Sequence, residues 1–406
     1  MRPAILVVLV ALLHGARVHA QDASEETTVT VTWAELEARL SDSPRLVAAH
    51  LAAEAGEGDV IAAGTPENPL LSLDFAGFLG GEPTNGGTQS QIVIGQTLPW
   101  PGQLDARVRA AQARLVADRS LVTLARAYAR LDLRRAYVAL LAAQDREALL
   151  AEAEARLSRI ATLVTARSTA GAGRRWDVVR IEAELAALRS TRDAARGDVA
   201  AARGRIAALL GRPGENVRAP GTLSDLAPLP IRATEREHPR LAVAQREIEA
   251  AEAAETRERA WAVPPIQLRV GAIVSSWPEG GYLLGGLSMP LPFVDQNRGA
   301  IERAAVQASA ARAARDATSR EVEAARIAAE RTLARRREAL ERFAGGVSSS
   351  LATIGEMAEI AFRGGEIDVF ELLDSVRATR ELVLGRIERD EAVRQAEIDL
   401  VEATTL

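Results

Sequence analysis

Few side chains in this sequence are of the types that carry catalysis. Its 406 residues contain no cysteine and four histidines, and only His50 and His238 lie beyond the first twenty residues. Neither histidine has a cluster of acidic residues beside it, so we expect no metal site built on histidine. A Ser-His-Asp triad would need one of these two histidines, and nothing near them in the sequence favours it. We therefore predict no enzyme activity and no cofactor.

One glycine-rich segment has the start of a dinucleotide-binding loop. Gly171-Ala-Gly-Arg-Arg-Trp supplies two glycines, but Trp176 stands where the third glycine is needed. A predicted helix precedes this segment, whereas a dinucleotide loop follows a strand. The segment is therefore expected to be a turn between helices.

Composition and the N-terminus indicate an exported protein. Arg2, an apolar stretch from Ala4 to Leu13 and the small residues around Ala20 are typical of a signal peptide over residues 1–20. The alternative, a permanent anchor, would need a longer apolar stretch. Removing residues 1–20 takes the formal charge from −5 to −7, which disfavours nucleic acid as a partner. No later segment has eighteen consecutive apolar residues, so any membrane contact would have to be made by strands.

The chain repeats itself at an almost constant offset. Pro44-Arg45-Leu46 returns as Pro239-Arg240-Leu241, Pro69 returns as Pro264, and Leu98-Pro99 returns as Leu291-Pro292. Each copy is predicted to contain a helix, two strands, a very long helix and a further helix. The predicted units are a first repeat over 21–210, a connector over 211–230 and a second repeat over 231–406. The first repeat is predicted to contain a β-hairpin at 69–98, a long helix at 103–167 and a helix at 176–210; the second, a hairpin at 265–290, a long helix at 299–362 and a helix at 366–404.

The long helices are predicted from the absence of helix breakers. Residues 103–167 contain neither proline nor glycine and are rich in alanine, leucine, arginine and glutamate. Leu150, Leu157 and Val164 recur with the spacing of coiled-coil packing. The two shorter helices of each copy together match its long helix in length, so antiparallel helices can line up as a wall.

The strands alternate in polarity and have about the length of membrane strands. Four strands are too few to close a membrane barrel, so several copies must share one: two would give eight strands, and three would give twelve around a water-filled pore. Trp100 and Trp261 follow the strand–helix junctions and suit a membrane-interface position. Packing of the junction itself explains them equally well, and each hairpin taken alone also fits a soluble protein.

Several segments resemble the outer membrane factor family of TolC-like channels, which serve efflux and type I secretion. They are Asn68-Pro-Leu-Leu-Ser-Leu, Gln96-Thr-Leu-Pro-Trp-Pro-Gly-Gln, Leu210-Gly-Arg-Pro, and the two helix turns beginning at Ala170 and Arg363. The resemblance covers nearly the whole mature chain and is closest to the branch with heavy-metal efflux channels. It implies a mainly α chain with membrane β-structure, in which long antiparallel coiled-coil helices form an α-barrel and four strands per chain enter a shared 12-stranded trimeric β-barrel. It also implies the outer membrane of a Gram-negative bacterium, with the helices in the periplasm.

The resemblance assigns roles and partners as well. It implies a homotrimer working with a periplasmic adaptor and an inner-membrane pump of the RND or ABC type. Asp177, Glu371 and Asp374 match acidic residues at the periplasmic constriction, where three copies would form rings that favour cations. The alternative is that they are ordinary acids at helix starts. Adaptor contact is expected at the turns between helices, at Arg167, Gly171, Gly173, Arg363, Gly364 and Gly365.

The resemblance leaves the cargo open. A passive channel for small molecules or metal ions and a channel for type I protein secretion would have the same sequence pattern. A periplasmic coiled-coil adaptor without a barrel is the alternative from another class. An adaptor would show one helical hairpin flanked by β-rich segments, in place of two strand hairpins between doubled long helices.

Overall fold

The computed structural model describes residues 28–77, 88–230, 238–276 and 280–405, without the side chains of 347–353. The predicted signal peptide and the turn of the first hairpin lie outside these residues. The main helices are α1 (Trp33–Arg39), α2 (Pro44–Gly64), α3 (Gln103–Thr169), α4 (Arg175–Leu210), α5 (Pro239–Ala260), α6 (Arg298–Gly364) and α7 (Val369–Thr405). The strands are β1 (Val29–Thr30), β2 (Leu70–Ala76), β3 (Gln89–Leu98), β4 (Val217–Arg218), β5 (Ile266–Ser275) and β6 (Gly280–Ser288), and short 3₁₀ turns lie at η1 (Leu40–Asp42) and η2 (Leu223–Asp225).

The first helical segment begins at a capping box and breaks at a proline. Thr32 caps α1, because its hydroxyl accepts from the Glu35 N–H while the Glu35 carboxylate accepts from the Thr32 N–H. An interruption at Ser43-Pro44 separates η1 from α2, which has the proline as its first residue.

Some element boundaries differ from the prediction. Among the described residues, the first helix of the second repeat has Pro239 as its first residue; residues 231–237 lie outside the described part. The second long helix continues through Gly364, which we expected to lie in the turn. Helix α7 begins at Val369 and not at Glu366, because the Asp368 carboxylate accepts the Glu371 N–H and so caps the helix three residues later than expected. Helix α3 likewise extends two residues past its predicted end, through Thr169.

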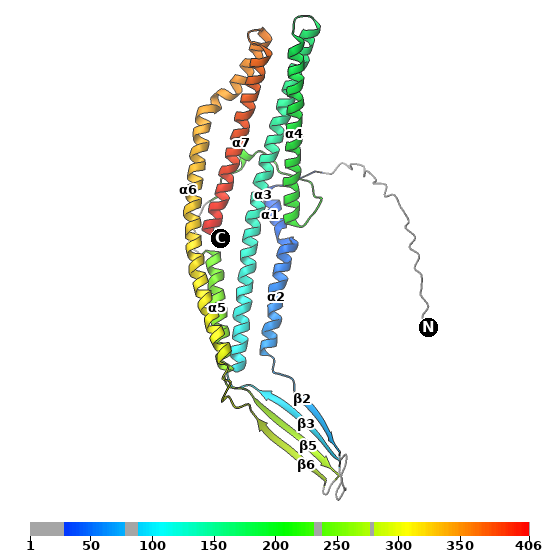
Figure 1. Cartoon of the computed structure of the whole chain (residues 1–406), viewed down its shortest axis with the longest axis vertical. Helices are drawn as coiled ribbons and strands as arrows, with labels where there is room; N and C mark the ends of the chain where they lie inside the picture. Colours follow the sequence, from blue (N-terminus) through cyan, green and yellow to red (C-terminus); the bar gives the residue numbers. More distant parts are fainter. Residues whose placement is uncertain (1–27, 78–87, 231–237, 277–279, 406) are drawn as a thin grey trace, which may run out of the picture.

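The helices lie side by side in a curved layer, with the sheet at one end (Figure 1). Helix α3 spans the full length of the layer and packs along α2 and α4 on one side and along α5 and α7 on the other. Helix α6 then packs along α5 and α7, so the lateral order is α2 with α4, α3, α5 with α7, and α6. Each pair of shorter helices therefore matches one long helix. None of the described helices is both long and apolar enough to cross a membrane.

The shorter helices meet end to end beside the long ones. Gly211, which ends α4 with φ 68°, approaches the start of α2 so closely that a Cβ atom there would lie 2.2 Å from Pro44 Cδ. A hydrophobic core surrounds this level and includes Leu133, Leu141 and Ile398, which are fully buried. Strands β1 and β4 pair in parallel at the edge of this core and attach the N-terminal segment to the connector. A second core, near the tips of the helices, joins α3, α4, α6 and α7.

Both hairpins belong to one antiparallel sheet in the order β2-β3-β5-β6. The central pairing joins the two repeats, from Gln89 opposite Ser275 to Leu98 opposite Ile266. Strands β2 and β6 form the two edges. Because β2 follows α2 and β6 precedes α6, the strands and the helices have the same lateral order.

Candidate functional sites on the sheet, at its junction with the helices and at the helix tips

One face of the sheet is apolar across all four strands. Residues directly opposite one another in an antiparallel sheet share a face, and the register places apolar side chains in line: Leu73 lies opposite Ile92, and Ile92 opposite Ala272. The exposed members of this apolar face are Leu71, Leu73, Phe75, Ile92, Ile94, Leu98, Leu268, Val270, Val274, Leu283 and Leu287. A patch of this kind marks a surface that another apolar phase covers.

The opposite face carries most of the polar and small side chains. Its polar members are Ser72, Asp74, Gln89, Gln91, Thr97, Gln267, Arg269, Ser275 and Ser288. Gly95, Gly271 and Gly286 lie among them in one band across the sheet. Such a face suits contact with water, whereas the other face suits contact with an apolar phase.

The two tryptophans at the junction of sheet and helices face the protein more than the surroundings. The Trp100 indole N–H donates to the Pro264 carbonyl oxygen at 2.9 Å, and its side chain is 37% exposed. Trp261 ends α5 and is partly buried, and its indole nitrogen is buried without a hydrogen-bond partner among the described residues. Trp100 thus takes part in the packing of the junction, and the membrane-interface position of both tryptophans stays a prediction.

A buried glutamine that sequence reasoning missed organises the same junction. Gln103, the first residue of α3, is 2% exposed. Its side-chain amide nitrogen donates to the carbonyl oxygens of Ala260 at 2.9 Å and Val263 at 2.7 Å. Its side-chain amide oxygen accepts from the main-chain N–H of Trp100. A glutamine directly after Pro-Trp-Pro-Gly at a helix start was the available signal.

The two turns between helices have the same construction. Gly171 (φ 76°) and Gly365 (φ 81°) adopt the left-handed conformation in which glycine is favoured. Gly173 lies too close to the backbone of the same turn for a free choice of side chain, since a Cβ atom would be 3.0 Å from the Ser168 nitrogen. These glycines, like Arg363 and Gly364, are exposed at the tips.

Arg167 joins the two tips. Its guanidinium donates to the carbonyl oxygen of Arg363 at 2.9 Å and to that of Phe362 at 3.4 Å, and it lies 5.1 Å from the centre of the Phe362 ring. These carbonyls belong to the last turn of α6, where a helix leaves carbonyl groups without its regular donors. The Phe362 carbonyl also accepts from the Gly365 N–H at 3.2 Å. An arginine of the first repeat therefore caps a helix of the second.

Further arginines that sequence reasoning missed connect α4 with α7. The Arg180 guanidinium lies 4.4 Å from the centre of the Phe370 ring. The Glu184 carboxylate pairs with Arg377 and lies 3.9 Å from Arg380, and the hydrogen bond from Arg377 lowers the pKa of Glu184. These charged residues flank the apolar positions of the helices, as the interhelical ion pairs of coiled coils do.

Of the three acids expected at the constriction, Asp177 lies in the first turn of α4, Glu371 in the first turn of α7 and Asp374 one turn further along α7. Asp177 is partly buried and Asp374 is exposed. Glu371 is exposed, and its carboxylate accepts the Asp368 N–H at 3.2 Å while the Glu371 N–H donates to Asp368. Glu371 thus serves the start of α7, which is the structural role held open above.

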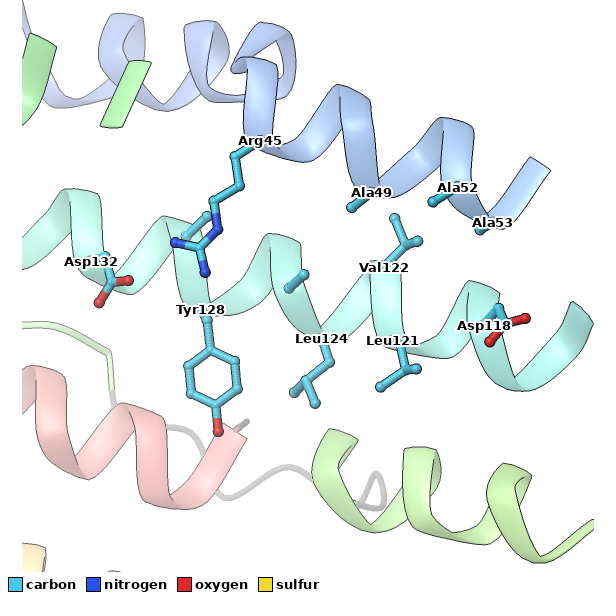
Figure 2. A pocket seen from close by; sticks show the side chains of 12 residues that line it. Arg45, Ala49, Ala52, Ala53, Asp118, Leu121, Val122, Leu124, Tyr128 and Asp132 are labelled. Carbon is cyan, nitrogen blue, oxygen red and sulfur yellow. The ribbon is translucent and has the colours of Figure 1, made fainter. Parts of the chain in front are cut away.

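Several hollows lie along the layer of helices. One of about 710 Å³ opens between α2 and α3, and Figure 2 shows Arg45 reaching across it from α2. Tyr128 points from α3 toward the neighbouring helices, and Asp118 and Asp132 lie toward its two ends. Within the residues that the structure describes, no group of three or more histidines and acids is placed to hold a metal ion.

Comparisons with known proteins agree with this architecture. Residues 36–212 match the family model described as outer membrane efflux protein. No protein of curated function matches the sequence. The fold is similar to that of CusC, with a TM-score of 0.75 and 16% identity over 92% of each chain. It is similar to the Neisseria gonorrhoeae MtrE outer membrane channel in its open state (TM-score 0.74, 16% identity, 92% of this chain and 88% of that one) and to the Campylobacter jejuni CmeC outer membrane channel (0.71, 13%, 99% and 94%).

These similarities confirm the expected fold class and, over residues 36–212, the family resemblance. The chain is mainly α and internally duplicated. Its long antiparallel helices and its four-stranded sheet have the fold of these outer-membrane channels.

Proposed function

We propose that this chain, whose residues 36–212 match the outer membrane efflux proteins and whose fold is that of outer-membrane channels, is the channel component of a tripartite efflux system. It is a passive export channel for small molecules or metal ions, and an inner-membrane pump supplies the energy. The observation that carries the proposal is the sheet, which has one apolar exposed face, one more polar face and two open edges.

The apolar face meets lipid, and lipid forbids open edges. Unpaired backbone groups in hydrocarbon each cost several kcal/mol, so β2 and β6 must pair with other strands. Within one chain, β2 and β6 run in opposite directions, because three antiparallel pairings separate them. When copies stand side by side, β6 of one copy therefore lies antiparallel to β2 of the next, and the sheet continues without a change of pattern.

Three copies give the barrel that the function needs. Two copies would supply eight strands, whose interior side chains fill. Three copies supply twelve strands and leave a water-filled lumen lined by the more polar face. Since the helices follow the same lateral order as the strands, the same ring joins α6 of one copy to α2 and α4 of the next and forms a tube of helices.

The location of the chain and its partners follow from the proposed tube. The sheet lies in the outer membrane of a Gram-negative bacterium, and the helices extend into the periplasm with their tips far from the sheet (Figure 1). The tips, with Gly171 and Gly365 at their ends, contact the periplasmic adaptor, and the adaptor connects to an RND or ABC pump. Asp374 adds negative charge at this end of the tube. The chain itself performs no catalytic step.

The cargo is set by the pump. Metal ions, as in the heavy-metal branch, and small organic molecules both fit a passive channel. Protein export in a type I system is the alternative, and the pump encoded next to this gene distinguishes the two.

Membrane fractionation with crosslinking in detergent tests the proposal. We expect an outer-membrane species with the mass of three chains that dissociates on heating. A peripheral inner-membrane protein would support the adaptor alternative. A stable monomer in detergent, or a water-soluble monomer, would refute the shared barrel.

A further inference from the structure

The first repeat docks onto the second at the junction of sheet and helices. Junction loop 1 (residues 99–102, between β3 and α3) lies against linker 2 (residues 261–265, between α5 and β5). Trp100 donates to Pro264, and Gln103, directly after the loop, donates to Ala260 and Val263. These bonds satisfy carbonyl groups at the end of α5 and in linker 2 that the helix leaves without partners.

The second repeat has the same parts without the contact. Junction loop 2 (residues 289–297, between β6 and α6) is longer, and the offset of Leu98-Pro99 to Leu291-Pro292 equates Trp100 with Phe293 and Gln103 with Gln296. Phe293 is 80% exposed, Val294 is 98% exposed, and Gln296 is exposed.

The linker of the first repeat is also uncovered. Linker 1 (residues 65–69, between α2 and β2) is exposed throughout, and it includes Pro69, the counterpart of Pro264. Pro264, which receives Trp100, is partly buried. One docking loop and one docking site are therefore left over, at opposite lateral edges of the chain.

We propose that junction loop 2 docks onto linker 1 of a second copy of this chain, with Phe293 against Pro69 and Gln296 donating to the Asn68 carbonyl oxygen. This inference rests on the proposed ring of copies and specifies a contact that closes it. The internal duplication supports the inference, because junction loop 1, the counterpart of junction loop 2, already makes the corresponding contact with linker 2 within one chain.

The chemistry of the two surfaces favours a protein partner over lipid. In linker 1 the carbonyls of Thr65 and Glu67 already accept from Arg107 and Gln96 of the same chain. The proposed bond therefore falls on the carbonyl of Asn68, the counterpart of Val263, with which acyl chains cannot pair. Gln296 lies three residues from Phe293 and supplies the amide donor that such carbonyls need. The prolines Pro290 and Pro292 restrict the backbone of junction loop 2, which lowers the entropy lost on docking.

Cysteine crosslinking between differently tagged copies tests the contact. The chain has no cysteine, so introduced thiols are the only targets. One full-length copy carries Phe293→Cys, the other carries Pro69→Cys, and the two are co-expressed and treated in outer membranes with a short bis-maleimide. Leu291→Cys and Val294→Cys replace Phe293→Cys in parallel samples. We expect a crosslinked species that carries both tags.

The contact inside one chain provides the matched control. Trp100→Cys and Pro264→Cys should crosslink when they are in the same chain and should give no species with both tags when they are in different copies. The opposite behaviour is expected for Phe293→Cys and Pro69→Cys. A pair that crosslinks only within one chain would overturn the inference.

Two further results would overturn it. An intact trimer in which no cysteine of junction loop 2 crosslinks to Pro69→Cys would reject the docking and leave the proposed channel standing. Quenching of a fluorophore on Phe293→Cys by brominated acyl chains, in that same trimer, would assign the loop to lipid. Absence of any oligomer would reject the proposed function together with the inference.

Discussion

Replacing Arg167 by alanine should loosen the contact between the two helix tips. The Arg167 guanidinium donates to the carbonyl oxygens of Phe362 and Arg363 and lies over the Phe362 ring. Alanine leaves the Arg363 carbonyl without its donor, leaves the Phe362 carbonyl with the Gly365 N–H alone, and removes the stacked cation. Because the arginine belongs to α3 and the carbonyls to α6, the loss falls on the contact between the repeats.

The size of the effect follows from the geometry and the exposure. A hydrogen bond to a charged group contributes about 1.5–3 kcal/mol when buried, and a cation over an aromatic ring adds about 0.5–1 kcal/mol at an exposed site. Water replaces part of both here, because Arg167 is only partly buried and Arg363 is exposed. We therefore expect a loss of about 1–2 kcal/mol, which raises the population of separated tips about 5–30-fold.

Hydrogen exchange followed by mass spectrometry measures this change in the purified oligomer. Amides in the last turn of α6 and the first turn of α7 should exchange faster in the Arg167→Ala variant, by the same factor as the population. Arg174→Ala is the matched control, because it removes the same charge from an exposed position at the same tip. Channel conductance in planar bilayers should rise in Arg167→Ala and not in Arg174→Ala.

Equal exchange in the two variants would refute this reasoning. It would mean that the apolar core beneath the tips, which includes Leu157, Ile181 and Leu372, holds them together without the arginine. Faster exchange along the whole of α6 would instead assign Arg167 a role in the fold.

Three other predictions test separate parts of the chain. Gly211→Ala should destabilise the chain by more than about 2 kcal/mol, since its Cβ atom would clash with Pro44 in addition to the cost of a left-handed backbone. Gly214→Ala, which has open space and φ 86°, should cost only about 1–2 kcal/mol for its left-handed backbone, and the melting temperatures of the two variants measure the difference. Burial lowers the pKa of His238 below its ordinary value of 6.5, so the folded state binds fewer protons and stability should fall as the pH drops below 6.5; His238→Asn keeps an acceptor for the helix cap, and its melting temperature should lose this pH dependence. Asp374→Asn should reduce the preference for cations, seen in the reversal potential across a salt gradient, and an unchanged potential would remove this residue from the constriction.

The sequence predicts the elements well because their causes are local. The run without proline and glycine predicts α3, and alternation of polarity predicts all four strands. Thr32 and Glu35 have the spacing of a capping box. Asp368 and Glu371 are also three residues apart, so the structural role of Glu371 was within reach of the same rule.

Contacts between repeats were not predictable in the same way. Alternation assigns a face to Ile92, but it does not say that β3 pairs with β5. The capping of α6 by Arg167 depends on how two helices separated by about 200 residues align. Gln103 is polar at a helix start, where exposure is the usual expectation, and only the neighbouring linker explains its burial.

The junction where α2 and α4 meet end to end divides the layer of helices into two segments, one next to the sheet and one next to the tips. Helix α3 passes this junction without interruption. Two heptads could therefore be added to α2 and to the facing part of α3, and likewise to α5 and to the facing part of α6. Such insertions would lengthen only the part of the layer next to the sheet. The tips would keep their own helix register. Evolution can therefore adjust the reach of such a protein across its compartment without redesigning the end that meets a partner.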